Sequence, residues 1–376
     1  MDRREFALSI ATGAAVAAVG SRRSAHGARG QPTPISALYS KAIVIDSLCA
    51  PVVDLESGPG ADALAAVKQS GVTAVNFSVS IPDSEETLHN LSRVQRLTED
   101  HPDAFSIVRR HSDIARCKSE QKLGIMLGFQ YPTALEEDPE RINTYRNLGV
   151  RIMQLTYNSR GKFGSGCLDE SDGGLTPEGR LAIATMNSAG VAVDLSHAGP
   201  RTTSQAIVAS AKPVLISHTG CAAISDHPRN QPDANLRMLA DRGGYLGIYL
   251  MPYLVASPTV PTREHVLNHL LHAINVCGSD HVGIGSDGAI QGVVASPAGR
   301  TALEQSHAQR VSAGVSAPGE DRDPYVPDLN GPDRLEVIAG ELARRGQPAS
   351  VIEKVLGANF QRVIGDIWGA DSLPKA

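Results

Sequence analysis

Eight short, almost continuously apolar runs alternate with helical stretches beyond residue 35, and this alternation constrains the fold more than any other feature. The runs are Ala42–Asp46, Val72–Val79, Leu123–Phe129, Val150–Leu155, Val191–Leu195, Val214–Ser217, Tyr245–Leu250 and Val282–Ser286. Strands without a polar face are typical of parallel sheets that are buried on both sides. Amphipathic stretches such as Pro177–Ala189 and Thr202–Ala211 separate them. Eight such units predict an α/β protein with a TIM-like (β/α)8 barrel.

The length allows one barrel, which needs roughly 250 residues or more, or a pair of ordinary domains. We favour a single barrel domain over residues 35–376 of the 376-residue chain. The net charge of −5 gives no support for the basic face of a nucleic-acid-binding protein. Residues 288–332 are rich in Gly, Pro, Ala and Ser and predict a long loop after the last strand. A C-terminal helix over Pro348–Trp368 is expected to pack outside the barrel.

Residues 1–30 have the layout of an export signal. Arg3-Arg4-Glu5-Phe6 precedes an apolar run from Ala7 to Gly20, and Ala25-His26-Gly27-Ala28 offers a small-residue cleavage site. The arginine pair resembles that of a twin-arginine signal, which predicts a periplasmic or extracellular protein. The alternative is an anchor that is never cut, although the run is short for a membrane span.

Polar residues follow six of the predicted strands, at the end where barrel enzymes carry their active sites. These residues are Asp46, Gln130, Tyr157, His197, His218 and Asp287. His197 and His218 each end a Ser-His pair on consecutive strands, so their side chains should meet at one rim. Two neutral imidazoles there could form half of a zinc site, or they could simply be hydrogen-bonded histidines.

For two further residues, the sequence allows either a functional role or a purely structural one. Asp287 could bind a metal, could take a proton from metal-activated water, or could only cap a loop. Arg229 could clamp a substrate carboxylate through two hydrogen bonds, or could form a surface salt bridge. The five scattered cysteines, with no Cys-x-x-Cys pair, predict buried idle thiols rather than a disulfide framework, although a single disulfide remains open.

Several motifs together resemble the membrane (renal) dipeptidase family of zinc metallopeptidases, from about Ile43 to Trp368. They are Leu148-Gly149-Val150-Arg151, Leu155-Thr156, Gly174-Leu175-Thr176-Pro177, Gly179-Arg180, Asp194-Leu195-Ser196-His197, Ser217-His218, His227-Pro228-Arg229-Asn230, Gly243-Gly244, Asp280-His281-Val282-Gly283-Ile284-Gly285-Ser286-Asp287 and Gly357-Ala358-Asn359-Phe360. The resemblance implies a TIM-like barrel with a two-zinc site that hydrolyses dipeptides.

The resemblance also implies roles for individual residues. His197 and His218 match two metal ligands, Asp287 matches the catalytic aspartate, and Arg229 matches the arginine that binds the substrate carboxylate. Three positions depart from the family pattern. Leu48-Cys49-Ala50 replaces a His-x-Asp pair of ligands, Gln130 replaces a bridging glutamate, and Tyr157 replaces a substrate-binding histidine.

These departures predict one zinc ion rather than two, held by His197 and His218 with Asp287 and Gln130 as supporting ligands. Tyr157 can still donate a hydrogen bond to a substrate carbonyl. We therefore expect a hydrolase of dipeptides or related small amides. The alternative is an inactive small-molecule-binding protein on the same scaffold, and a third reading is different chemistry at Cys49 or Asp46. A homodimer is expected from the resemblance alone.

Overall fold

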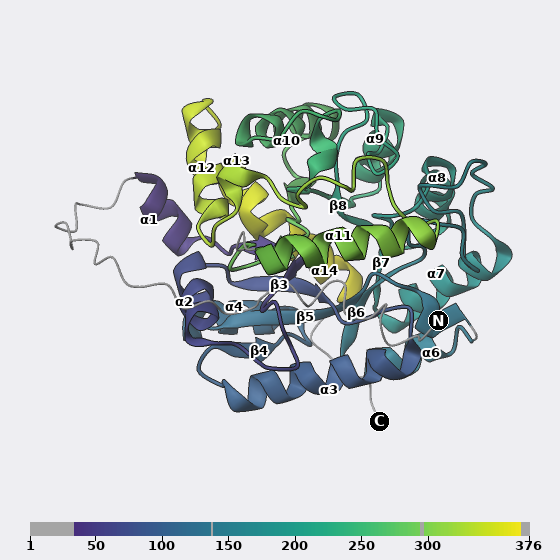
Figure 1. Ribbon diagram of the computed structural model, residues 1–376, viewed down its shortest axis with the longest axis horizontal. Coiled ribbons are helices and arrows are strands. Elements are labelled where there is room, and N and C mark those ends of the chain that lie inside the picture. The colour runs from purple at the N-terminus through teal and green to yellow at the C-terminus, as the bar shows by residue number, and fades with distance from the viewer. Residues whose placement is uncertain (1–33, 137, 294–296, 370–376) are drawn as a thin grey trace.

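The structure is a computed structural model that describes residues 34–136, 138–293 and 297–369. Its main sheet is parallel, and the order of strands around it is β1 (Ile45–Asp46), β3 (Ala74–Ser78), β5 (Leu123–Phe129), β6 (Val150–Gln154), β7 (Ala192–Asp194), β8 (Leu215–Thr219), β9 (Tyr245–Ile248) and β10 (Val282–Ile284). Each predicted run overlaps one of these strands, and only β8 extends beyond its run, to Thr219. The (β/α)8 prediction is therefore confirmed (Figure 1).

A few backbone hydrogen bonds join the end of the last strand to the segment after the first strand and so close the barrel. The Ser47 backbone N–H donates to Ile284 O at 2.9 Å, and the Asp287 N–H donates to Leu48 O at 2.8 Å. Just beyond these bonds β2 (Cys49–Ala50) pairs with β11 (Gly288–Ala289). This seam places the segment after β1 beside the segment after β10. A ninth strand, β4 (Phe105–Ile107), pairs with the start of β5 and was not predicted, because a serine interrupts it and only Phe105 is fully buried, so it shows no continuous apolar run.

Helices cover the outside of the sheet between successive strands (Figure 1). They are α1 (Pro34–Lys41), α2 (Ala61–Ser70), α3 (Ser84–Asp100), α4 (His111–Glu120), α5 (Thr133–Glu136), α6 (Arg141–Asn147), α7 (Pro177–Ala189), α8 (Pro200–Ala209), α9 (Asp233–Asp241), α10 (Arg263–Cys277), α11 (Pro297–Ser312), α12 (Arg334–Arg344), α13 (Ala349–Glu353) and α14 (Asn359–Trp368). Helix α7 shows why the boundaries fall where they do. The Thr176 hydroxyl caps the Gly179 N–H at 2.9 Å, and Gly190 ends the helix at φ 67°.

The C-terminal helix closes one end of the barrel, so the prediction that it packs outside is wrong. Phe360, Val363, Ile364 and Ile367 of α14 are buried in one apolar cluster with an interior side chain from each of seven strands. Those side chains are Ile45, Ala74, Met126, Ile152, Ala192, Leu215 and Tyr245. The strongly apolar face of α14 finds more area to bury at the open end of the barrel than on its wall.

The segment 288–332 contains the 16-residue helix α11, so it is not one continuous loop. The high Gly and Pro content of the whole segment concealed a local stretch from Arg300 to Ser312 that has neither residue. Ala, Leu, Glu, Gln and Arg in that stretch are good helix formers. Helix α11 runs across the barrel between α12 and the α7–α8 side (Figure 1).

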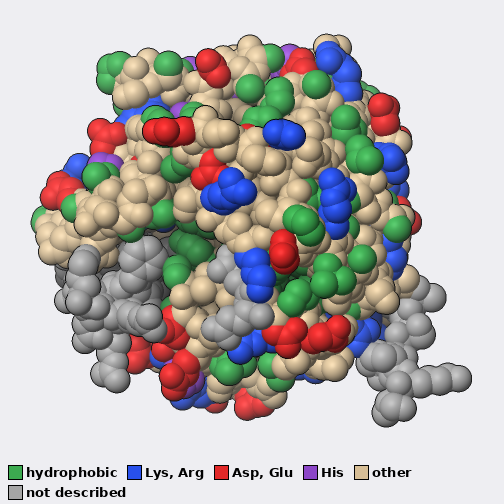
Figure 2. All heavy atoms as spheres, turned by 90° about the vertical axis from the view of Figure 1, so that its right-hand side faces the viewer, with side chains coloured by type: hydrophobic (Ala, Val, Ile, Leu, Met, Phe, Trp, Pro, Cys, Tyr) green, Lys and Arg blue, Asp and Glu red, His purple; other side chains and the backbone are tan. Residues whose placement is uncertain are grey.

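The predicted export signal lies outside the described residues, and export stays a prediction. No helix in the described ranges is long and apolar enough to cross a membrane. Figure 2 shows the molecule from the right-hand side of Figure 1. On this face, positively and negatively charged side chains are interspersed with apolar ones. That face therefore carries no continuous basic surface.

Candidate active site

The two Ser-His strand ends bring their imidazoles together as predicted. His197 lies three residues beyond the end of β7 and His218 lies within β8, and their Nε2 atoms are 3.0 Å apart. The side chains are inaccessible, with 3% of His197 and none of His218 exposed. Which ring nitrogens carry protons decides what this pair can do, and the surrounding hydrogen bonds settle that question.

Asn158 fixes the tautomer of His197. The Asn158 Nδ2 group donates to the backbone oxygen of Val315 at 2.9 Å, and a carbonyl oxygen can only accept. The other amide atom, Oδ1, therefore faces His197 Nδ1 at 2.6 Å. Because Oδ1 also only accepts, Nδ1 carries the proton. His197 Nε2 is left with a lone pair that points toward His218.

Asp194 fixes the tautomer of His218 through a serine. Its carboxylate accepts from the Ser196 N–H at 3.1 Å and hydroxyl at 2.6 Å, and from the Ser217 N–H at 3.0 Å and hydroxyl at 2.5 Å. Burial raises the pKa of Asp194, and these four donors act in the opposite direction. The Ser217 proton is used toward Asp194, so Ser217 Oγ must accept from His218 Nδ1 at 2.9 Å. His218 Nε2 also keeps a lone pair.

Two imidazole lone pairs thus face each other with no proton between them. Burial, and then the nearby Arg229 guanidinium, lower the pKa of both histidines well below the ordinary value, which keeps both rings neutral. Zinc–nitrogen bonds are about 2.0–2.1 Å long, and ligating histidines usually donate their other N–H to an oxygen, as these two do. The pair therefore fits one metal ion that binds both nitrogens.

Side chains of the kinds that ligate metals are sparse around the pair among the described residues. In the part of the chain that the structure describes, no three His, Cys, Asp or Glu side chains gather as a metal site. The Gln130 amide nitrogen lies 3.4 Å from His218 Nε2, so Gln130 is next to the pair as predicted. An amide turned by 180° would present its oxygen at that point.

Asp287 lies where β10 ends, at a φ of +57° that few residues other than glycine adopt. Burial raises its pKa to about 7, with Arg229 and the Gln130 amide acting against that rise and Asp46 reinforcing it. Asp287 forms no three-ligand group with the histidines in the described structure. Its role as a direct ligand stays a prediction, and its pKa suits a group that exchanges protons near neutral pH.

Arg229 is a buried cation, so the surface salt-bridge alternative is wrong. Only 2% of the residue is exposed, and its Nη1 donates to the backbone oxygen of Ser196. None of the ion pairs among the described residues includes Arg229. The guanidinium also lies 6.0 Å from the centre of the Tyr249 ring. A buried guanidinium without a carboxylate partner is suited to bind an anionic group of a ligand.

Tyr157 stacks directly on the histidine pair. Its ring is 4.1 Å from that of His197 on one side and 4.0 Å from that of Tyr131 on the other. Arg310 Nη1 donates to the Tyr157 hydroxyl at 3.4 Å, so the phenol can use its own proton toward a ligand. Tyr131, Asn158 and Arg310 were not predicted. Arg310 carried no signal because it belongs to the segment that was taken for a loop.

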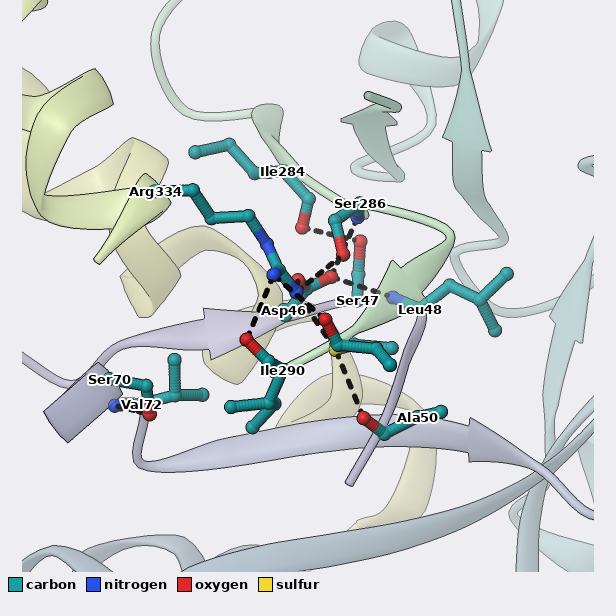
Figure 3. A network of polar contacts seen from close by, with 12 residues as sticks. Asp46, Ser47, Leu48, Ala50, Ser70, Val72, Ile284, Ser286, Ile290 and Arg334 are labelled. Carbon is teal, nitrogen blue, oxygen red and sulfur yellow. Dashed lines mark hydrogen bonds and ion pairs between the residues drawn. The ribbon is translucent and has the colours of Figure 1, made fainter. Parts of the chain in front are cut away.

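Asp46 lies at the barrel seam beside the buried Arg334 (Figure 3), and Cys49 contacts the same arginine. Arg334, from the start of α12, donates to Cys49 Sγ and Ser286 Oγ at 3.2 Å each, and lies 3.6 Å from the Asp46 carboxylate. Burial raises the pKa of the Cys49 thiol, so at neutral pH it is protonated and a poor metal ligand. All five cysteines are free thiols, which excludes the single disulfide that the sequence left open.

Comparisons with known proteins bear on the family and the fold of this chain. The family described as Membrane dipeptidase (Peptidase family M19) matches residues 33–305. Dipeptidase verJ of Clonostachys rogersoniana is 26% identical over 286 residues, which is 75% of this chain and 65% of that protein. An uncharacterized dipeptidase of Schizosaccharomyces pombe is 30% identical over 206 residues, 54% of this chain and 50% of that protein. The chain thus spans about half to two thirds of the length of these relatives.

Solved structures share the fold. An amidohydrolase from Pseudomonas aeruginosa is 30% identical with a TM-score of 0.77, and the match covers 89% of this chain and 99% of that one. A metallo peptidase from Rhodobacter sphaeroides has a TM-score of 0.72 at 17% identity, with 87% and 100% of the two chains covered. The second likeness concerns the barrel alone.

Proposed function

This chain belongs to the membrane dipeptidase family, and on that basis we propose that it is a hydrolase with one zinc ion held by His197 and His218. Its proposed substrate is a dipeptide, or a related small amide that carries a carboxylate. The observation that carries the proposal is the 3.0 Å distance between the two Nε2 atoms, together with the hydrogen bonds that place both ring protons on Nδ1. Two neutral imidazoles fixed in this way lack a cation between them.

A zinc ion at this point would supply a Lewis acid and lower the pKa of water, which makes water a nucleophile at neutral pH. Asn158 and the Asp194–Ser217 pair hold the two imidazoles in the ligating tautomers. Gln130 lies beside them and could complete the ligand set or hold water. Burial of the histidines keeps bulk water away and strengthens the electrostatic interactions within the site.

Three other side chains are proposed to bind the substrate, polarise its carbonyl group and transfer the proton. Arg229 pairs with the substrate carboxylate and so places the amide bond over the histidine pair. The Tyr157 hydroxyl donates to the substrate carbonyl oxygen as negative charge develops there. Asp287 takes a proton from the attacking water and returns it to the leaving amine, for which a pKa of about 7 is well matched.

The role of Arg229 gives a direct test with substrates. Zinc-loaded protein should hydrolyse dipeptides with a free C-terminal carboxylate, and should cleave the same dipeptides with an amidated C-terminus about 10–100-fold less efficiently in kcat/KM. That factor corresponds to a charged hydrogen bond worth about 1.5–3 kcal/mol. The Arg229→Gln variant should lose most of this discrimination.

The contrary result is equally informative. If dipeptides bind to the zinc-loaded protein at equilibrium but no hydrolysis of any member of the panel is detected, the hydrolase proposal fails. The inactive binding protein on the same scaffold would then be the better description. Isothermal titration with the same dipeptides distinguishes the two outcomes.

A further inference from the structure

Residues 310–322, here called the strap, hydrogen-bond to Asn158 and Tyr157, two side chains that contact His197. Val315 O accepts from Asn158, Pro318 O accepts from His227 at 2.8 Å, and Arg322 Nη1 donates to Val255 O at 3.1 Å. The strap is thereby tied to the loops after β6, β8 and β9. Because His197, His218 and Arg229 are almost wholly inaccessible, a substrate can reach them only when part of the surrounding chain moves.

The strap is held mainly by polar contacts. Among the described side chains of the strap and of α11, which leads into it, only Arg310 and Ala317 are buried. Arg310 Nε pairs with Glu320 Oε1 at 2.6 Å, and Glu320 Oε2 accepts from the Ala317 N–H at 2.8 Å. Segments with few buried apolar contacts open at low free-energy cost. Glu320 therefore helps to shape the strap without contacting the histidines.

Asn158 joins the strap to the metal pair by hydrogen bonds at both ends of its amide, whereas Arg310 reaches His197 only through the stacked Tyr157 ring. With the strap closed, Val315 O requires the amide nitrogen, so the amide oxygen faces His197 and Nδ1 is protonated. Without Val315 O, the amide orientation is opposed only by a weak contact of the Cys167 thiol with Oδ1 at 3.5 Å, so the amide can turn over. The nitrogen would then face His197, Nδ1 would have to accept, and the ring proton would move to Nε2.

The two tautomers have opposite consequences at the pair. With the proton on Nε2, His197 donates to His218 Nε2 across the 3.0 Å gap, and the pair is satisfied without a cation. With the proton on Nδ1, both lone pairs face each other and a cation is needed. The orientation of one amide therefore selects between a self-paired and a metal-binding arrangement.

We propose that Asn158 is a positioning residue that couples closure of the strap to the metal-binding tautomer of His197. The functional consequence of this coupling rests on the proposed metal site. The coupling itself can be tested in metal-free protein. Since coupling between two sites is reciprocal, strap closure raises metal affinity and metal binding closes the strap. The site is then fully assembled only when it is closed.

The first test uses metal-free protein, so that it does not depend on the proposed function. The Glu320→Gln variant should speed hydrogen exchange of the strap amides and shift the His197 ring nitrogens, by nitrogen-15 NMR, from the Nδ1–H toward the Nε2–H pattern. Glu304→Gln, the same change at an exposed position of α11, is the matched control and should alter neither. Faster strap exchange with an unchanged His197 tautomer would overturn the proposal.

The second test measures zinc affinity. Asn158→Ala should weaken it about 10–100-fold, as expected for a group that orients a ligand. Asn158→Asp keeps an acceptor on His197 but repels Val315 O, so it should retain zinc while its strap exchange no longer responds to zinc. Glu320→Gln should weaken zinc binding in the wild-type background and not in Asn158→Asp. Equal weakening in both backgrounds would refute the coupling.

The two proposals can fail separately. If the wild-type chain binds no zinc but its His197 tautomer follows the strap, the coupling stands and the hydrolase proposal fails. If zinc binds and the tautomer ignores the strap, the hydrolase proposal stands and the coupling fails.

Discussion

The Asp287→Asn variant is expected to lose about 10²–10⁴-fold in kcat for dipeptide hydrolysis, the usual contribution of a positioned acid–base group. Asparagine has nearly the same shape and can still hydrogen-bond to the Gln130 side chain, but it cannot take a proton. Zinc content and KM should therefore stay close to those of the wild-type protein. Steady-state kinetics together with metal analysis of the same preparations check this prediction.

The matched control is Asp241→Asn at the exposed end of α9, which should leave kcat unchanged. A rate within a few-fold of wild type for Asp287→Asn would exclude Asp287 as the proton-transfer group. Loss of zinc together with the rate would instead assign Asp287 as a direct ligand. The experiment thus distinguishes a proton-transfer role of Asp287 from a role as a metal ligand, which one carboxylate cannot easily combine.

The second large effect is expected on stability, in the Arg334→Met variant. The Arg334 guanidinium donates to Ala289 O at 2.9 Å and Ile290 O at 3.2 Å, and it is the cation next to the buried Asp46 carboxylate. Burial already raises the pKa of Asp46, and Arg334 is the strongest influence that lowers it. Removing one partner of a buried ion pair costs about 3–5 kcal/mol.

Urea unfolding of metal-free protein measures this cost, with Arg237→Met as the control. Arg237 is a mostly exposed member of an i,i+4 ion pair, so its loss should cost at most about 1 kcal/mol. Adding Asp46→Asn to Arg334→Met should recover part of the loss, because no uncompensated charge then remains buried. If Arg334→Met unfolds at the wild-type urea concentration, the seam network does not stabilise the barrel.

The strand ends could be predicted from the sequence because burial on both faces leaves a continuous apolar run. That pattern located His197, His218, Gln130, Tyr157 and Asp287 at one rim. It could not place Asn158 or Arg310, whose partners Val315 and Tyr157 are 157 and 153 residues away in the chain. Such contacts depend on how a segment folds back over the barrel, which local composition does not encode.

The same limit explains the errors at the C-terminal part of the chain. The spacing of apolar residues predicted the last helix. It could not predict which surface the helix packs against, because an apolar helix face can be buried on the outer wall or at the open end of a barrel. The prediction of one ion came from the replacements at Cys49 and Gln130. The reason that the remaining histidines favour an ion, namely their fixed tautomers, emerges only from the hydrogen bonds around Asp194 and Asn158.

The most direct test of the central claim is the zinc content of the purified chain, with His197→Ala and His218→Ala measured alongside. One zinc per chain, lost in both variants, is the predicted result. Zinc at 100 times its Kd should also raise the unfolding free energy of the wild-type chain by about 2.7 kcal/mol and leave both variants unchanged. No bound metal after zinc supplementation, or two ions per chain, would contradict the account.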